Sequence, residues 1–211
     1  MKQENSPQQN RIDTVIFDIG NVLTDFKEKR FYLELGYPEE IAERLYRATM
    51  GSDCWVEYDR GLLSDEEILS LFQKNDPGLA SEIARALSDT HGLVARRDSA
   101  IPWIRKVKAA GRKVLVLSNF SRKIKRECAD ALDFLPETDG GILSFQDRCV
   151  KPDPIIYALL LSRYQLDPAH AVFIDDTEQN LVAAREAGLQ TILYRTQEQA
   201  EAELDEMLSL N

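Results

Sequence analysis

Residues 15–22 have the sequence VIFDIGNV, and this stretch decides how the rest of the chain is interpreted. Its apolar run ends at the carboxylate of Asp18, and Gly20 follows two residues later. A short apolar run of this kind is typical of a buried parallel strand, which delivers polar side chains to one edge of its sheet. The stretch therefore predicts a strand over residues 14–18 with Asp18 at its carboxyl end.

Three segments far along the chain are suited to meet Asp18. Two are again apolar runs that end in polar residues, LVLSN at 115–119 and VFIDD at 172–176, and the third is KPDP at 151–154. Because ligands bind beyond the carboxyl ends of strands in α/β sheets, we expect these side chains to form one site. They supply a nucleophilic carboxylate, a hydroxyl, a cation and an acidic pair, a set suited to phosphoryl transfer at a divalent metal.

Composition narrows the class of protein. A chain of 211 residues suits one domain with a large insertion, or one domain plus a small one. The net charge of −10 argues against nucleic acid as a partner, because phosphate backbones demand a basic face. No apolar stretch approaches the roughly 20 residues of a membrane helix, and residues 1–10 lack the apolar core of a secretory signal. We therefore expect a cytoplasmic protein with a disordered polar tail over residues 1–10 and no membrane partner.

The periodicity of the chain predicts its fold class. Residues 28–91 show mostly helical periodicity and contain no buried-strand run, which predicts an all-helical insertion. Strands and helices alternate afterwards, which indicates an α/β parallel sheet with helices on both faces. The expected strands are 113–118, 141–145, 171–175 and 190–194, and the expected helices are 101–110, 122–132, 155–164, 180–187 and 197–210.

Carboxylates at two strand ends are the basis of the predicted chemistry. Asp18 at a strand end could attack phosphorus and form an aspartyl-phosphate, although alone it is better explained as a turn cap. The pair Asp175 and Asp176 at a second strand end could form a hard-oxygen site for Mg²⁺, or could cap the helix that follows. With Asp18 in the same register, a metal site is the better interpretation.

Other polar residues complete the expected site. Ser118 and Asn119 can donate hydrogen bonds to phosphate oxygens, and Lys151 can neutralise charge on the transferring group. Alone, Ser118 could equally cap a turn or helix, and Lys151 would ordinarily be a solvated surface lysine. Pro152 holds Lys151 on a stiff loop, because proline restricts the residue before it. Asn180 could orient the metal-binding carboxylates, or could simply start a helix.

The order of these motifs resembles the haloacid dehalogenase superfamily. The resemblance covers nearly the whole chain after residue 10, and four motifs in order at fitting separations form a strong signal. The segments FDIGNVL at 17–23 and KPDPIIY at 151–157 are similar to those of subfamily IA, and of its bacterial sugar-phosphatase branch that includes α-D-glucose-1-phosphatase.

The resemblance implies a fold and an activity. The fold is a Rossmann-like parallel-sheet core, formed by residues 11–26 and 95–211, with a helical C1-type cap inserted at 27–94. The activity is a Mg²⁺-dependent phosphatase that acts on a small phosphorylated metabolite, such as a hexose 1-phosphate, through an aspartyl-phosphate.

The resemblance also implies roles for individual residues. Asp18 is the expected nucleophile, and the expected magnesium ligands are Asp18, the carbonyl of Gly20 and Asp176, with Asp175 assisting at the metal. Phosphate is expected to be bound by Ser118, Asn119 and Lys151. Lys151 is also expected to be catalytic.

Gly20 departs from the pattern of the superfamily, where most phosphatases carry an aspartate that serves as general acid and base. Glycine keeps the backbone carbonyl but lacks the acid, and the loss of positioned acid–base catalysis typically costs about 10²–10⁴-fold in rate. The leaving group could need little protonation, as in an anomeric sugar phosphate or an acyl phosphate, and we favour this reading because the remaining machinery is present. Alternatively another acid could substitute: Asp25, which could instead cap a helix, or Asp59 or His91 behind it. Finally, the chain could bind phosphorylated ligands without catalysis.

Two other matters stay open at this level. A haloacid dehalogenase, which displaces halide without metal, is an alternative class that the acidic pair argues against. Trp55, Tyr58, Asp59 and Arg60 form a cluster in the expected cap that could line a sugar-sized pocket. Trp55 and Tyr58 at helical spacing are, however, more often packing residues. The sequence leaves the physiological substrate and the oligomeric state undetermined.

Overall fold

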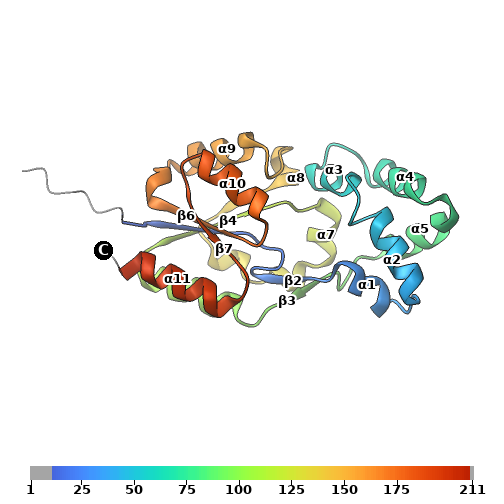
Figure 1. Cartoon of the computed structure of the whole chain (residues 1–211), viewed down its shortest axis with the longest axis horizontal. Helices are drawn as coiled ribbons and strands as arrows, with labels where there is room; N and C mark the ends of the chain where they lie inside the picture. The colour runs from blue at the N-terminus through green and yellow to red at the C-terminus, as the bar shows by residue number, and fades with distance from the viewer. Residues whose placement is uncertain (1–10, 210–211) are drawn as a thin grey trace, which may run out of the picture.

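A five-stranded parallel sheet forms the centre of the larger part of the molecule (Figure 1). The computed structural model describes residues 11–209, so the tail predicted at 1–10 and the last residue of the helix predicted at 197–210 lie outside it. The strand order is β5-β4-β1-β6-β7, which places the strand before Asp18 in the middle. The strands are β1 (Thr14–Phe17), β4 (Lys113–Ser118), β5 (Gly141–Leu143), β6 (Ala171–Asp175) and β7 (Gln190–Leu193).

Helices cover both faces of this sheet, which explains why its strands are apolar at successive positions. Phe17 points to one face, where its ring lies 4.7 Å from that of Trp103, and Ile16 belongs to the core on the opposite face. Figure 1 shows α9 and α10 on one side of the sheet and α11 on the other. The covering helices are α6 (Ala100–Ala109), α9 (Pro154–Tyr164), α10 (Glu178–Glu186) and α11 (Gln197–Ser209).

Five helices lie together at one end of the molecule, beyond the carboxyl ends of the strands (Figure 1). The helical block predicted between the first two core strands is therefore confirmed. Its helices are α1 (Glu28–Glu34), α2 (Glu39–Ala48), α3 (Cys54–Arg60), α4 (Asp65–Asn75) and α5 (Ala80–Ser88), with a short 3₁₀ turn η1 (Pro77–Leu79). Gly61 ends α3 in a left-handed conformation, and a capping box between Ser64 and Glu67 opens α4. Within residues 11–209, no helix is long and apolar enough to cross a membrane.

A two-stranded antiparallel sheet joins the two parts and was not predicted. Strand β2 (Thr24–Phe26) pairs with β3 (Val94–Arg96), and Phe26 lies opposite Val94. The predicted boundaries between a core (11–26 and 95–211) and a cap (27–94) both fall at this pair of strands. Asp25 lies inside β2, so its interpretation as a helix cap is wrong. Its carboxylate is instead paired with Arg97 at 2.6 Å.

Two predicted elements end at least two residues earlier than expected. The strand expected at 141–145 stops at Leu143, because Leu143 is paired with the last residue of β4, and α8 (Ser144–Asp147) follows. The helix expected at 122–132 is divided into α7 (Arg122–Glu127) and the 3₁₀ turn η2 (Ala129–Leu132), where the chain tightens to i→i+3 bonds. Two further 3₁₀ turns are η3 (Leu135–Glu137) and η4 (Pro168–His170).

Candidate active site

The loop after β1 holds Asp18 at the carboxyl edge of the sheet. The Asp18 N–H donates to the carbonyl of Ile174 on β6 at 2.9 Å, which continues the sheet pairing past the end of the strand. The loop then closes on the carbonyl of Ile19, which accepts from the backbone N–H and the hydroxyl of Thr24 at 3.0 Å each. Asn21 takes a left-handed conformation (φ 58°), which asparagine tolerates better than most residues. The Asp18 side chain is thus carried on a tightly closed turn.

The carboxylates predicted to meet are brought together. Asp18, Asp175 and Asp176 each offer a carboxylate oxygen, and these three atoms lie within 4.8 Å of one another. The Nζ of Lys151 donates to Asp18 Oδ1 at 2.7 Å and to Asp175 Oδ2 at 2.6 Å. The Lys151 side chain is only 2% exposed, so a cation that would be solvated at a surface is here enclosed among carboxylates.

Burial and charge set the ionisation of this cluster. Burial raises the pKa of Asp18 to about 6; Lys151 opposes this shift, and Asp175 and Asp176 add to it. Burial alone would lower the pKa of Lys151, but Asp175 and Asp18 outweigh it and raise that pKa above its usual range. Lys151 is therefore an ammonium ion that pairs with Asp18 and Asp175, and the nearby Asp176 brings the cluster to three carboxylates for one positive charge.

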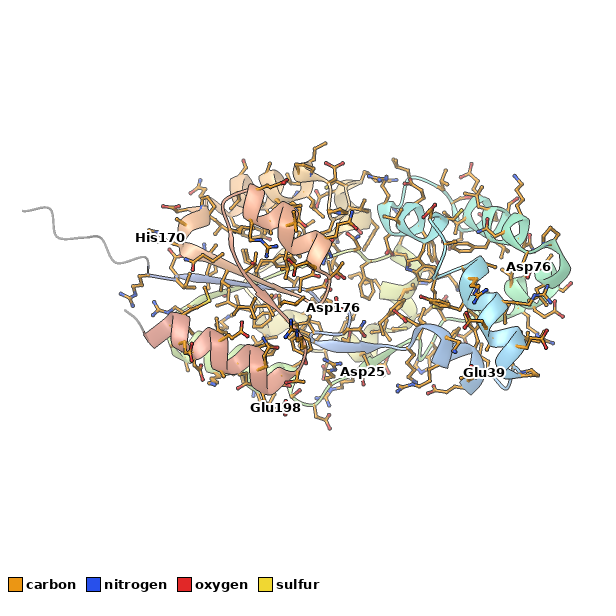
Figure 2. The ribbon with its side chains drawn as sticks, viewed as in Figure 1. Asp25, Glu39, Asp76, His170, Asp176 and Glu198 are labelled. Atoms are coloured by element: carbon orange, nitrogen blue, oxygen red, sulfur yellow. The ribbon has the colours of Figure 1, made fainter. Side chains whose placement is uncertain are left out.

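The two residues of the acidic pair have different surroundings. Asp175 is fully buried, and its carboxylate accepts from the Thr177 N–H at 2.7 Å and from the Asn180 amide at 3.1 Å, in addition to Lys151. Asp176 accepts from the Asn21 amide at 3.1 Å and is less enclosed. Figure 2 shows Asp176 where the strands of the sheet give way to the helices. The carboxylate of Asp176 is therefore the more accessible of the two.

A cavity of about 250 Å³ opens onto these groups. The core contributes Asp18, Ser118 and Lys151 to its walls, and the helical part contributes Trp55 and Asp59 from α3. A cavity of this size accommodates a small metabolite, and its concentration of polar groups on one side suits an anionic substituent.

Ser118, the last residue of β4, and Asn119, which follows it, make different contacts at the cavity. The hydroxyl of Ser118 makes only a long contact of 3.4 Å, to the carbonyl of Asn119, and it lines the cavity. The amide of Asn119 accepts from the Lys151 N–H at 2.8 Å and donates to the Lys151 carbonyl at 3.0 Å. The Asn119 side chain thus fastens the loop that carries the buried lysine, and direct contact with phosphate remains a prediction.

Sequence reasoning assigned no role to three residues that shape the site. The Asn21 amide binds Asp176 to the loop after β1. Its place within residues 15–22, next to Asp18, could have indicated this role. Arg97 donates to the carbonyls of Asn21 and Val22 at 2.7 and 3.0 Å, and nothing in the sequence around it marks that role. Glu28 lines the cavity, and burial together with Asp176 raises its pKa.

The remaining sequence candidates lie in different places. Asp59 lines the cavity, whereas Asp25 and His91 do not. His91 is exposed, and its ring lies 3.1 Å from the Glu127 carbonyl. Trp55 packs against Phe26, Tyr58 and Phe72, as the helical spacing suggested, while also lining the cavity. Arg60 is paired with Glu57 on its own helix.

Residues 12–188 match the family model of the haloacid dehalogenase-like hydrolases. The chain belongs to this family. The membership agrees with the resemblance inferred from the motifs, and it makes the protein a hydrolase with the α/β fold described above. The match does not distinguish subfamily IA from other branches.

Curated relatives differ in length and in name. The chain is 27% identical over 192 residues to a phosphorylated carbohydrates phosphatase of Thermotoga maritima, covering 86% of this chain and 84% of that protein. It is 28% identical over 206 residues to mouse acyl-CoA dehydrogenase family member 10, covering 92% of this chain but only 19% of that protein.

Solved structures share the fold at low identity. A haloacid dehalogenase family enzyme, BT-2542 of Bacteroides thetaiotaomicron, in complex with magnesium and inorganic phosphate, has a TM-score of 0.64 at 18% identity and covers 88% of this chain and 96% of its own. The L-2-haloacid dehalogenase of Xanthobacter autotrophicus, with chloropropionic acid covalently bound, has a TM-score of 0.61 at 19% identity and covers 92% and 83%.

Proposed function

We propose that this protein is a Mg²⁺-dependent phosphatase that hydrolyses a small phosphorylated metabolite, such as a hexose 1-phosphate, through an aspartyl-phosphate on Asp18. The observation that carries the proposal is a cluster of three carboxylates within 4.8 Å of one another, two of them bridged by a buried lysine, beside a cavity of about 250 Å³. The similarity to a phosphorylated carbohydrates phosphatase and to the fold of an enzyme solved with magnesium and inorganic phosphate supports it.

The donor set fits magnesium. Hard carboxylate oxygens are the ligands that Mg²⁺ prefers, and three carboxylates with one lysine leave an excess of negative charge that a divalent cation balances. Asp18 and Asp176 would hold the ion together with the carbonyl of Gly20, and Asp175 would assist at the metal while it orients Lys151. When bound, Mg²⁺ would supply positive charge against the oxygens of the transferring phosphoryl group.

The residues of the chain divide the remaining work. Asp18 is the nucleophile, and Lys151 holds its carboxylate in place at 2.7 Å before the phosphoryl group arrives. As charge develops on the phosphoryl oxygens, the ammonium of Lys151 and the hydroxyl of Ser118 face it across the cavity. The apolar ring of Trp55 lines the cavity from the helical part, where it would contact the organic part of a bound substrate.

Dehalogenation is the competing activity, because a related fold carries it. The electrostatics of the cluster disfavour it. A haloacid substrate brings a further carboxylate to a wall where three carboxylates share one ammonium ion, and without a metal that approach is repulsive.

The test is a screen of phosphorylated metabolites with Mg²⁺, run beside an Asp18→Asn variant and in EDTA. We expect wild-type turnover that EDTA abolishes and that the variant lacks. 2-Chloropropionate serves as the dehalogenase arm, scored by chloride release. Phosphatase activity that persists in EDTA, or wild-type rates no higher than those of Asp18→Asn on every phosphate, would contradict the proposal.

A further inference from the structure

The largely buried residue Asp59 presents its carboxyl group to the active-site cavity. The residue is 7% exposed, and it lines the same cavity as Asp18 and Lys151 although it comes from the helical part. Among the described residues its side chain makes no hydrogen bond or ion pair. The carboxyl group therefore opens onto the cavity, where a bound substrate would meet it.

The backbone around Asp59 is fastened to the core. The hydroxyl of Ser144 on α8 donates to the Asp59 carbonyl at 2.6 Å, and the same hydroxyl accepts from the Phe120 N–H at 2.9 Å. The adjacent Gly61 approaches so closely that a Cβ there would lie 2.9 Å from the Cβ of Phe145. Arg148 also donates to the carbonyl of Gly61. These contacts hold Asp59 against the core. Through Ser144 it lies beside Phe120, which is two residues past the end of β4.

No other carboxyl group of the cavity occupies a comparable place. Gly20 has no side chain, and Asp25 is paired with Arg97 outside the cavity. Glu28 lines the cavity but is exposed, and its electrostatic neighbour is Asp176. The charges that act on Asp59 are those of Lys151 and Asp18. Asp59 thus lines the same cavity as the nucleophile and lies close enough to feel its charge.

We propose that Asp59 is the general acid and base of this enzyme and replaces from the cap the carboxyl group that Gly20 lacks. This inference rests on the proposed phosphatase function. As the bond from Asp18 Oδ to phosphorus forms and the bond to the ester oxygen breaks, Asp59 gives its proton to the leaving oxygen and becomes a carboxylate. It then takes a proton from the water that attacks the aspartyl-phosphate, which releases inorganic phosphate and restores both groups.

The ionisation of Asp59 agrees with this role. Burial raises the pKa of Asp59 to about 8; Lys151 opposes the shift and Asp18 adds to it. A carboxyl group with such a pKa carries a proton near neutral pH, as a general acid must, and can lose it without a large penalty.

The test compares Asp59→Asn with wild type on three phosphates that lack sugar hydroxyls: 4-nitrophenyl, phenyl and benzyl phosphate. The leaving oxygens become more basic in that order, so the need for a proton rises, while every substrate carries a single benzene ring. We expect kcat/KM of Asp59→Asn to fall by roughly 10²–10⁴-fold on benzyl phosphate and by less than about tenfold on 4-nitrophenyl phosphate. Glu57→Gln, an exposed change on the same helix, is the matched control and should behave as wild type.

The outcomes separate the two proposals. If wild type hydrolyses none of these phosphates nor any metabolite in the screen, the phosphatase function itself fails. If wild type is active and Asp59→Asn loses the same factor on all three, Asp59 only shapes the cavity and the acid assignment is overturned. The assignment is also overturned if Glu28→Gln, rather than Asp59→Asn, shows the loss that depends on the leaving group.

Discussion

Replacing Lys151 by methionine tests whether one buried ammonium ion holds the carboxylate cluster together. Methionine has a similar length but no charge, so the change leaves Asp18, Asp175 and Asp176 facing one another without a cation. Lys151 is 2% exposed and bonded at 2.7 and 2.6 Å. Removing one partner of such a buried pair costs about 3–5 kcal/mol of unfolding free energy, because the remaining charge stays buried and uncompensated.

The assay is urea unfolding in EDTA, so that no metal substitutes for the lysine. Lys106→Met is a matched control, because Lys106 also contacts two carboxylates, at 3.1 and 2.8 Å, but its side chain is 48% exposed. Surface pairs contribute about 0.2–1 kcal/mol, so the control should lose no more than that. Combining Lys151→Met with Asp175→Asn should cost about 0.5–3 kcal/mol less than the sum of the single changes.

Two results would refute this reasoning. One is a Lys151→Met variant that unfolds with the small loss of the Lys106→Met control, which would mean that the buried ion pairs add nothing to stability. The other is strict additivity of the Lys151 and Asp175 changes, which would mean that the two groups do not act as a pair. Addition of Mg²⁺ should recover part of the loss in Lys151→Met, since it restores positive charge among the same carboxylates.

Three further outcomes are expected. Although burial opposes it, hydrogen bonds from Lys123 and Thr90 lower the pKa of Glu127 from 4.5 to about 2. The resulting stability, at most about 3 kcal/mol, is present above pH 4.5 and is lost as pH falls toward 2. Glu127→Gln should therefore unfold at a lower temperature than wild type at pH 7, and the two unfolding temperatures should converge in acid. Asp25→Asn should leave kcat on every phosphate within about threefold, because Asp25 pairs with an arginine outside the cavity; a loss like that of Asp59→Asn, of roughly 10²-fold, would make Asp25 the acid. Gly61→Ala should lower benzyl phosphate turnover more than 4-nitrophenyl phosphate turnover, since a Cβ at φ +68° would press on Phe145 and displace Asp59; equal effects on both substrates would argue against that displacement.

Much of the core was predictable because parallel strands are short, continuous apolar runs whose signal is local. The runs ending at Asp18, Ser118 and Asp175 could be assigned from sequence, and the rule that polar residues gather at the carboxyl ends of strands brought them together correctly. The pairing of β2 with β3 escaped prediction, because three-residue strands carry too little pattern to be distinguished from a loop. The misinterpretation of Asp25 follows from that omission.

The sequence by itself determined the order of the five core strands along the chain, the identity of the clustered groups and the absence of an acid at Gly20, because each of these depends on residues close together in the chain. Only the tertiary structure decided which carboxyl group of the helical part lines the cavity together with Asp18. The bond that anchors Asp59 joins it to Ser144, 85 residues away, and depends on how α3 packs on α8. Contacts over such separations arise from the packing of whole elements, and no local pattern near Asp59 records them.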